Sequence, residues 1–548
     1  MKVVVLGGGV GGLSAAQELV ERGFQVEVYE KKTIWGGKAR SMPDPGTGTG
    51  GRQDLPGEHG FRFFPGFYKH LPDTMKRIPA PTASSPSHTA FQNLVGTTQI
   101  EMAQEKNPPI VTPSRFPRDY AEWKEAFVEL HRDKVGIPDI ELFVFAERLF
   151  QILTSCQERR LAEYETIQWW KFIDAASKST LYQKILGEGL TRSLVAMKAT
   201  KASTRTVGDI LIQLILNTLT PDANSDRVLN APTNDAWIDP WTTYLGNAGV
   251  KLVNNASILN INCTGTSITS VDIEIGGVKQ TITGDYYVAA MPCEVMTRFV
   301  TPAMTVAAPT LAGIGKLNTE WMNGIQFYLA TDVPIDNGHT IYLDSEWALT
   351  TISQHQFWPG VDLSKYGAGN VKGVLSVDIS DWTTPGVKTT TKPANQCTEQ
   401  EIAAEVWAQL KAHVNRPGMV LLNDSNMIGF HLDPDIQFPR ASSANDTNAE
   451  PLLVNVIDSW QYRPEATVGI TNLFLASDYV RTYTDLATME GANEAARRAT
   501  NGILKASGSS ATPCQLWPLV EPEIFDAAKK NDLARFRKGL PWTIFSSF

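Results

Sequence analysis

The sequence predicts a mixed α/β fold that contains a parallel sheet of the Rossmann type, and three observations support this prediction. The chain opens with an apolar segment at residues 3–6, a glycine-rich turn at 7–12 and a helix-forming segment that ends near Gly23. A second apolar segment, residues 26–29, follows directly. Near the other end of the chain, residues 473–503 repeat the order of strand, turn and helix. Strands that alternate with helices in this way predict parallel pairing.

The N-terminal turn has the spacing of a dinucleotide-binding site. Gly7 allows a tight turn, Gly9 lets the backbone approach a pyrophosphate, and Gly12 lets the helix pack closely on the strand. Gly11 lies in the first turn of this helix, whose N-terminal partial charge faces the phosphates. Glu30, after the second strand, is placed to accept a hydrogen bond from a ribose hydroxyl. A purely structural βα turn is the alternative, but the flanking elements favour dinucleotide binding.

The composition is that of a globular protein and excludes several classes of function. The 548 residues carry a net charge of −9 without a basic tract, so we expect no nucleic-acid partner. The five cysteines are scattered and the eight histidines show no metal-ligand spacing. We therefore expect no metal, no disulfide framework and a cytoplasmic location. No signal peptide precedes the first strand and no apolar run reaches the roughly 18 residues of a membrane span, so any membrane contact is expected to be peripheral.

The middle of the chain changes from helical to strand-like patterning. Between residues 118 and 220 the pattern is helical, and residues 207–215 are apolar nearly all round, which predicts a helix that is buried or lines an apolar pocket. Residues 250–290 alternate as strands do, with a hairpin turn at the glycine pair 276–277. A further helix is predicted from Thr398, which can cap it.

Three further motifs resemble those of one superfamily of flavoenzymes. Residues 36–41, GGKARS, are similar to the second glycine motif of the FAD-dependent amine oxidase and phytoene desaturase superfamily. Residues 58–68, EHGFRFFPGFY, resemble the E-x-G-x-H-x-F-x-G-x-Y block of plant-type phytoene and ζ-carotene desaturases, with Arg62 in place of the histidine. Residues 472–492 contain NLFLASD and LATMEGA, similar to the NLFLAGD and LASMEGA signature of these desaturases and of hydroxysqualene dehydroxylases. Ser477 stands where glycine is usual, a small change that still allows FAD.

This resemblance implies a glutathione-reductase-like fold, in which a Rossmann FAD-binding domain is assembled from separated segments and a substrate domain is interleaved with it. The implied FAD-binding segments are residues 1–78, 229–305 and 459–508. The substrate domain would consist of a mainly helical segment and a strand-containing segment, followed by a C-terminal tail, at residues 79–228, 306–458 and 509–548 respectively.

The resemblance also implies which residues contact FAD. Lys38 matches the basic residue that reaches the phosphates, and Asp478 matches the acid that holds the ribityl and pyrophosphate region. The helix that starts near Glu490 would point its N-terminus at the flavin, where its partial positive charge stabilises the reduced ring. Further contacts are expected from Lys31, Gly37, Arg40, Glu58, Gly60, Phe61, Arg62, Val253, Met489 and Ala492.

Two residues are candidates for a catalytic role. Desaturation requires little from side chains, because orientation of a C–H bond against flavin N5 in a dry cavity supplies most of the catalysis. Arg62 would stabilise developing negative charge or hold a polar substrate group, with a structural salt bridge as the equal alternative. Tyr483 would form an aromatic wall beside the flavin, with a core tyrosine as the alternative. Glu58 is expected to serve the cofactor loop rather than to act as a base.

The predicted function is therefore that of an FAD-dependent desaturase or dehydrogenase. Hydride would pass from an apolar substrate, of isoprenoid or carotenoid type, to the flavin, and oxygen or a quinone would accept the electrons. One alternative is a flavin amine or amino-acid oxidase that uses oxygen. The other is a non-redox protein, either an FAD-dependent carotenoid-type isomerase or a lipid-binding protein. The tail interleaves apolar and basic residues, so it is predicted either to pack on the body or to lie on a membrane surface.

Overall fold

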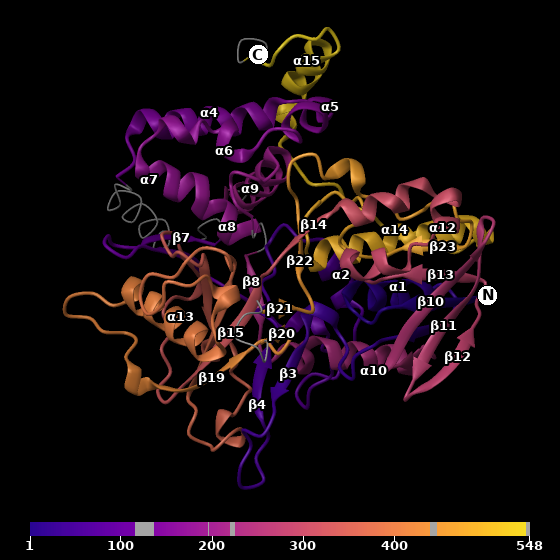
Figure 1. The fold of residues 1–548 in the computed structure, drawn as a ribbon, viewed down its shortest axis with the longest axis horizontal. Helices are drawn as coiled ribbons and strands as arrows, with labels where there is room; N and C mark the ends of the chain where they lie inside the picture. The colour runs from indigo at the N-terminus through magenta and orange to yellow at the C-terminus, as the bar shows by residue number, and fades with distance from the viewer. Residues whose placement is uncertain (115–135, 196, 220–224, 439–445, 544–548) are drawn as a thin grey trace.

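The computed structural model describes residues 1–114, 136–195, 197–219, 225–438 and 446–543 (Figure 1). The start of the predicted helical stretch, from residue 118 to 135, lies outside these residues, as do Ile544 and Phe545 of the tail. A five-stranded sheet with its helices lies to the right in Figure 1, a seven-stranded sheet lies to the left, and a group of helices lies above.

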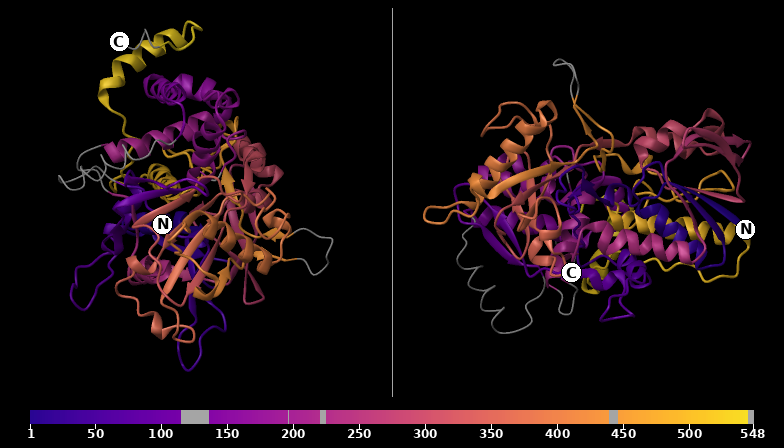
Figure 2. Two further views of the ribbon diagram at one scale, coloured as in Figure 1. Left: turned by 90° about the vertical axis from the view of Figure 1, so that its left-hand side faces the viewer. Right: turned by 90° about the horizontal axis from the view of Figure 1, so that it is seen from below.

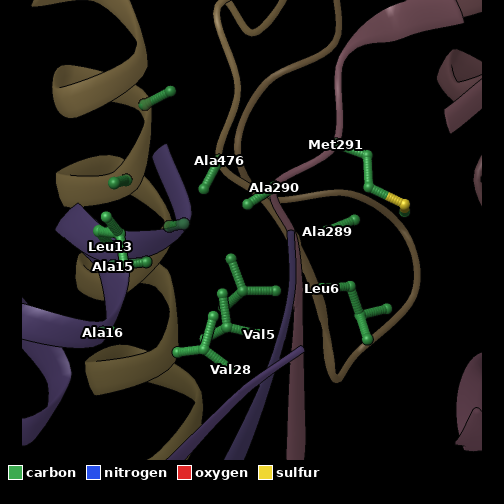
Figure 3. Close-up of a cluster of buried hydrophobic side chains, with 14 of the residues drawn as sticks. Val5, Leu6, Leu13, Ala15, Ala16, Val28, Ala289, Ala290, Met291 and Ala476 are labelled. Carbon is green, nitrogen blue, oxygen red and sulfur yellow. The ribbon is translucent and has the colours of Figure 1, made fainter. Parts of the chain in front are cut away.

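The five-stranded sheet is parallel and is assembled from three distant parts of the chain. Its order is β23 (Leu473–Leu475), β13 (Tyr286–Ala289), β1 (Lys2–Leu6), β2 (Gln25–Tyr29) and β9 (Lys251–Val253). Helices α1 (Val10–Val20) and α14 (Met489–Ser507) pack on it and on each other. Figure 3 shows Leu13, Ala15 and Ala16 of α1 close to Val5 and Val28. The small side chains of α1 allow this close packing, as the glycine-turn pattern predicts.

The seven-stranded sheet is antiparallel except for one pair. Its order is β19 (Met427–Leu432), β15 (Asn323–Leu329), β18 (Gly373–Ile379), β17 (Leu349–Ser353), β16 (Gly338–Tyr342), β6 (Gln99–Ala103) and β7 (Ile110–Pro113). Only β16 and β6 run parallel. Helix α13 (Glu399–Val414) covers one face, where Trp407 contacts Phe327. The predicted cap is confirmed, because Thr398 and Glu401 form a reciprocal capping box at its start.

The structure also contains several short sheets. The antiparallel three-stranded sheet contains the predicted hairpin and consists of β10 (Ala256–Thr264), β11 (Ser267–Ile275) and β12 (Val278–Ile282). The two-stranded pairs are β3 (Ser41–Asp44) with β4 (Leu55–Glu58), β5 (Leu94–Gly96) with β8 (Arg227–Leu229), β14 (Asn318–Glu320) with β22 (Leu452–Val454), and β20 (Ile436–Gln437) with β21 (Thr447–Asn448).

The helices above the sheets belong mainly to the segment between β7 and β8. They are α4 (Asp139–Thr154), α5 (Gln157–Arg159), α6 (Trp169–Phe172), α7 (Thr180–Tyr182), α8 (Leu190–Val195) and α9 (Thr204–Leu219). The apolar stretch that predicts a buried or pocket-lining helix falls within α9. The other helices are α2 (His70–Lys76), α10 (Asp239–Asn247), α11 (Cys293–Met296), α12 (Pro302–Ala307) and α15 (Asp526–Phe536).

The described part of the tail packs on the body. Helix α15 lies over α4 and α5 at one end of the molecule (Figures 1 and 2). Asp532 accepts hydrogen bonds from Arg159 Nε (3.0 Å) and Cys156 N (2.9 Å), and the Trp542 indole donates to Thr154 (3.0 Å). Within the described residues no helix combines the length and the apolar character that crossing a membrane requires. Contact with a membrane surface stays a prediction.

Asp532→Ala is expected to release the tail. The Asp532 and Arg159 side chains are almost fully buried, so removing the carboxylate leaves a buried guanidinium short of a partner and costs about 3 kcal/mol of docking free energy. Limited proteolysis should then cut the tail faster than in the wild type. Asp526→Asn, at the exposed start of the same helix, serves as the control. Equal cleavage of Asp532→Ala and the wild type would show that the ion pair does not hold the tail.

Candidate functional site

A cavity of about 840 Å³ lies at the carboxyl ends of β1, β2 and β13. Parallel strands present these ends at one edge of their sheet, which is where ligands bind in open α/β folds. The cavity continues past residues 59–68 to the seven-stranded sheet and to α9. It therefore joins the predicted dinucleotide site to the predicted substrate domain.

The glycine turn is tightly packed except where it faces the cavity. Gly7 has a φ of +113°, which favours glycine, and a Cβ on Gly11 or Gly12 would lie about 2 Å from a backbone oxygen. A Cβ on Gly9 would instead meet nothing nearer than Gly37 Cα at 3.6 Å. Gly9 also forms a β-bridge with Gly36 of the second glycine motif. The backbone thus leaves open the space that a pyrophosphate requires, and the turn fits FAD.

Glu30 is held at the edge of the cavity by backbone hydrogen bonds. Its Oε2 accepts from Gly8 N at 2.7 Å and its Oε1 accepts from Lys32 N at 2.8 Å. Its own N–H donates to the Val253 carbonyl at 2.8 Å, so Val253 supports the site from outside the cavity lining. Burial raises the pKa of Glu30 despite these donors. The carboxyl group is oriented before any ligand arrives, as a ribose acceptor should be.

The basic residues of the second glycine motif make internal ion pairs. Lys38 lies in the cavity lining, 2.9 Å from Glu294, and donates to the Pro451 carbonyl. Arg40 lies outside the lining and pairs with Asp435 and Glu450. Lys32 pairs with the same two carboxylates, 2.8 and 2.9 Å away. His59 also lies close to Asp435 and Glu450, within the spacing of a metal site, but Lys32 and Arg40 already neutralise both carboxylates.

Arg62 and Glu58 are buried together beside the cavity. Arg62 Nε lies 3.8 Å from Glu58, and its terminal nitrogen donates to the Gly60 carbonyl. Glu58 accepts from the Thr233 N–H (2.9 Å) and hydroxyl (2.7 Å) and lies outside the cavity lining. Burial raises the pKa of Glu58 to about 7, against the opposing charge of Arg62. Arg62 therefore both forms a salt bridge and reaches the cavity.

The structure brings most of the predicted site residues together but leaves Tyr483 apart. The predicted residues in the lining are Gly7, Gly9, Gly11, Glu30, Lys31, Gly37, Lys38, Gly60, Phe61, Arg62, Asp478, Met489 and Ala492. Gly12, Arg40, Glu58 and Val253 support this lining from behind. Tyr483 is 44 % exposed, with its ring 4.7 Å from the Arg498 guanidinium. The aromatic wall predicted for Tyr483 is therefore not built by this residue, because its backbone is tied to Glu494 outside the cavity.

The N-terminus of α14 opens onto the cavity as the resemblance implies. Thr488 caps the helix through Gly491 N, and Thr488, Met489 and Ala492 line the cavity. The positive end of the helix dipole can therefore act on a group bound there. Glu490 points away from the cavity and binds the backbone of residues 69–71.

The lining residues that carry no motif in the sequence include two sets. One follows β13 and includes Ala290, Met291, Pro292 and Glu294. These residues could have been found from the sequence because they directly follow an apolar strand, and parallel sheets bind ligands at the carboxyl ends of their strands. The other consists of His339, Thr350 and Asp378 in the seven-stranded sheet. These are single polar residues within buried strands, and no local pattern distinguishes them from structural residues.

Comparisons with known proteins agree with this geometry. Residues 5–78 match the family of NAD(P)-binding Rossmann-like domains, and residues 241–504 match the family of flavin containing amine oxidoreductases. A zeta-carotene desaturase from Synechocystis sp. is 23% identical over 92% of this chain and 97% of its own length. The zeta-carotene desaturase of Arabidopsis thaliana is 35% identical over 80 residues, 15% of this chain and 13% of its own.

Solved structures share the fold at low sequence identity. Cyclohexylamine oxidase from Brevibacterium oxydans superposes with a TM-score of 0.59 and 12% identity, covering 92% of this chain and 99% of its own. An oxidoreductase from Methanosarcina mazei gives a TM-score of 0.57 and 14% identity over 92% of this chain and 100% of its own. The predicted mixed α/β, Rossmann-containing fold is confirmed. These matches confirm the resemblance to the FAD-dependent amine oxidase and phytoene desaturase superfamily, and the protein is an FAD-dependent oxidoreductase.

Proposed function

We propose that this oxidoreductase dehydrogenates an apolar substrate of isoprenoid type. The observation that supports this is the apolar end of the cavity, where Phe63, Phe67, Ile210, Leu214 and Leu486 form the walls. Such walls exclude water and align a long hydrocarbon by contact alone. When bound, FAD supplies the acceptor for the hydride that leaves a C–H bond.

The residues of the chain act mainly by position in this proposal. The apolar walls hold the substrate against the flavin, and the N-terminus of α14 favours negative charge on the ring. Arg62 is flanked by the Glu58 and Asp378 carboxylates, which balance its positive charge. It can therefore act on a bound ligand as a hydrogen-bond donor rather than through net charge. The proposal assigns no side chain as base, and the proton that balances the departing hydride would pass to solvent.

Anaerobic bleaching of the flavin tests this function. The purified protein, loaded with FAD, is mixed with ζ-carotene or phytoene in detergent micelles, and the flavin absorbance near 450 nm is followed. Loss of absorbance with either polyene supports the proposal. Bleaching only by amines or amino acids would instead favour the amine oxidase alternative. Readmission of oxygen or addition of a quinone then shows which acceptor restores the absorbance.

Ile210→Asn should slow turnover without loss of flavin. Ile210 lies on α9 in the apolar wall, distant in sequence from both glycine motifs. A buried amide without a partner disfavours hydrocarbon binding by about 1–3 kcal/mol, so kcat/KM should fall roughly 5- to 150-fold. The FAD content should stay that of the wild type. Ile524→Asn, at a position 80% exposed, is the control. An unchanged kcat/KM in Ile210→Asn would show that the apolar wall does not hold the substrate.

A further inference from the structure

Three polar residues share the face of the seven-stranded sheet that closes the cavity. Thr350 lies directly opposite Asp378 in the β17–β18 pair, and opposite Ile341 in the β16–β17 pair. His339 precedes Ile341 by two residues and therefore points to the same side. All three line the cavity, and their exposures are only 4% for His339, 1% for Thr350 and 9% for Asp378.

Among the described residues, few hydrogen-bond partners are found for the imidazole and the carboxylate of this group. His339 Nδ1 is buried without a hydrogen bond in the described part of the chain, and its ring packs against the rings of Phe61 and Phe63, at centroid distances of 5.6 and 4.9 Å. Asp378 Oδ1 accepts one long hydrogen bond, 3.3 Å from Phe61 N. Buried polar groups in native proteins are almost always hydrogen-bonded. An imidazole and a carboxylate left in this state at the wall of an apolar cavity indicate a polar group on the ligand.

The charges around these residues define that group. Burial lowers the pKa of His339 to about 4, so its imidazole is neutral at pH 7 and offers one donor and one acceptor. Burial also raises the pKa of Asp378 to about 6, against the charge of Arg62, so most of this carboxyl is ionised at pH 7.

A ligand carboxylate would face the Asp378 carboxylate, and an ammonium has no lone pair with which to accept a hydrogen bond from the imidazole N–H or the Thr350 hydroxyl. A carbonyl has no proton to donate to Asp378 or to an imidazole nitrogen. A hydroxyl donates and accepts and carries no charge, so it matches all of these neighbours.

We propose that His339, Thr350 and Asp378 hold a hydroxyl group on an otherwise apolar substrate. This inference rests on the proposed function, because it names the substrate class of the same cavity. The hydroxyl donates to the Asp378 carboxylate or the imidazole nitrogen and accepts from the imidazole N–H or the Thr350 hydroxyl. The hydrocarbon then runs along the walls formed by Phe63 and Leu214. The three residues act here as specificity-determining residues, distinct from the reacting atoms.

Four probes on one saturated C20 skeleton test this inference by binding rather than by turnover. They are phytanol, phytane, phytanic acid and phytanylamine, titrated in detergent micelles at pH 7 into the FAD-loaded protein by calorimetry. Phytanol should bind about tenfold more tightly than phytane, the value of one satisfied hydrogen bond. Phytanic acid and phytanylamine should bind more weakly than phytanol.

Variants then assign the preference to these residues. Thr350→Val and His339→Phe should bind phytane as the wild type does and lose most of the preference for phytanol. His355→Phe is the matched control, since this histidine lies outside the cavity and is bound to Asp332. It should keep the full preference.

The proposal is overturned if phytane binds as tightly as phytanol or if the acid or amine binds most tightly. It is also overturned if Thr350→Val and His339→Phe both keep the preference for phytanol. A protein that prefers phytanol but is never bleached by a polyene would refute the proposed function and leave this inference standing.

Discussion

Gly9→Val should give a folded protein that has lost its flavin. The Cβ at this position meets only ordinary contacts, 3.6 Å from Gly37 Cα, so the apoprotein should keep its melting temperature. The branched methyl groups would enter the gap between the two glycine motifs, where the pyrophosphate must approach the backbone. We expect the Kd for FAD to rise at least about 100-fold, which corresponds to roughly 2.7 kcal/mol. The flavin absorbance of the purified protein and titration of apoprotein with FAD measure this directly.

A neighbouring glycine provides the contrast. A Cβ at Gly11 would lie 2.0 Å from the Ala476 carbonyl oxygen, so Gly11→Ala should lower the melting temperature even without flavin. Gly246→Ala, in α10, where a Cβ meets nothing within 4 Å, should leave FAD binding unchanged and should not lower the melting temperature. If Gly9→Val retained a full complement of FAD, the pyrophosphate would have to lie elsewhere and the assignment of this turn would be wrong.

Glu490→Ala should cause the largest loss of stability among single substitutions at the site. The buried carboxylate accepts hydrogen bonds of 2.8 Å from the backbone N–H groups of Lys69, His70 and Leu71 and from His70 Nδ1. His70 Nε2 in turn accepts from Trp517 N, so one carboxylate links α14, α2 and the start of the tail. Leaving these buried donors without an acceptor should cost about 3 kcal/mol or more in the free energy of unfolding.

The pH dependence of this contribution has a defined sign. Burial alone would raise the pKa of Glu490, but His70 and the backbone donors outweigh it and hold the pKa below its ordinary value of 4.5. The stabilisation is therefore complete above pH 4.5 and is lost as the pH falls through the lower folded-state value. Glu490→Gln should have a lower free energy of unfolding than the wild type at pH 7. Its free energy of unfolding should also fall less steeply than that of the wild type as the pH is lowered.

Thermal unfolding of the apoprotein, followed by circular dichroism between pH 3 and pH 7, measures both effects. Glu523→Ala, at an exposed position in the tail, is the control and should change the free energy of unfolding by less than about 0.5 kcal/mol. A melting temperature of Glu490→Ala equal to that of the wild type at pH 7 would show that the backbone donors find other acceptors.

The dinucleotide half of the site could be predicted from the sequence because its parts are local. A glycine turn, the helix that follows it and the acid that ends the next strand lie within residues 7–30. Their geometry depends on residue type and short spacing, so the same residues appear together in the cavity lining. The second glycine motif and the LATMEGA segment are also local patterns, and residues of both lie in the cavity lining.

Tyr483 shows where local reasoning fails. It lies within a few residues of Leu486 and Met489, which do line the cavity, yet its backbone binds Glu494 and its ring lies beside Arg498 at the surface. The direction of a side chain next to a motif depends on how the chain enters α14. That entry is set by hydrogen bonds to residues further along the helix rather than by the motif itself.

The sequence by itself determined the class of cofactor and the parallel sheet that holds it, because both follow from backbone geometry encoded over short distances. Only the tertiary structure determined which residues form the cavity wall on the seven-stranded sheet. Thr350 meets Asp378 through strand register, and His339 joins them from a third strand. Each is a lone polar residue in a buried strand, and its neighbours come from pairing between strands rather than from adjacent sequence.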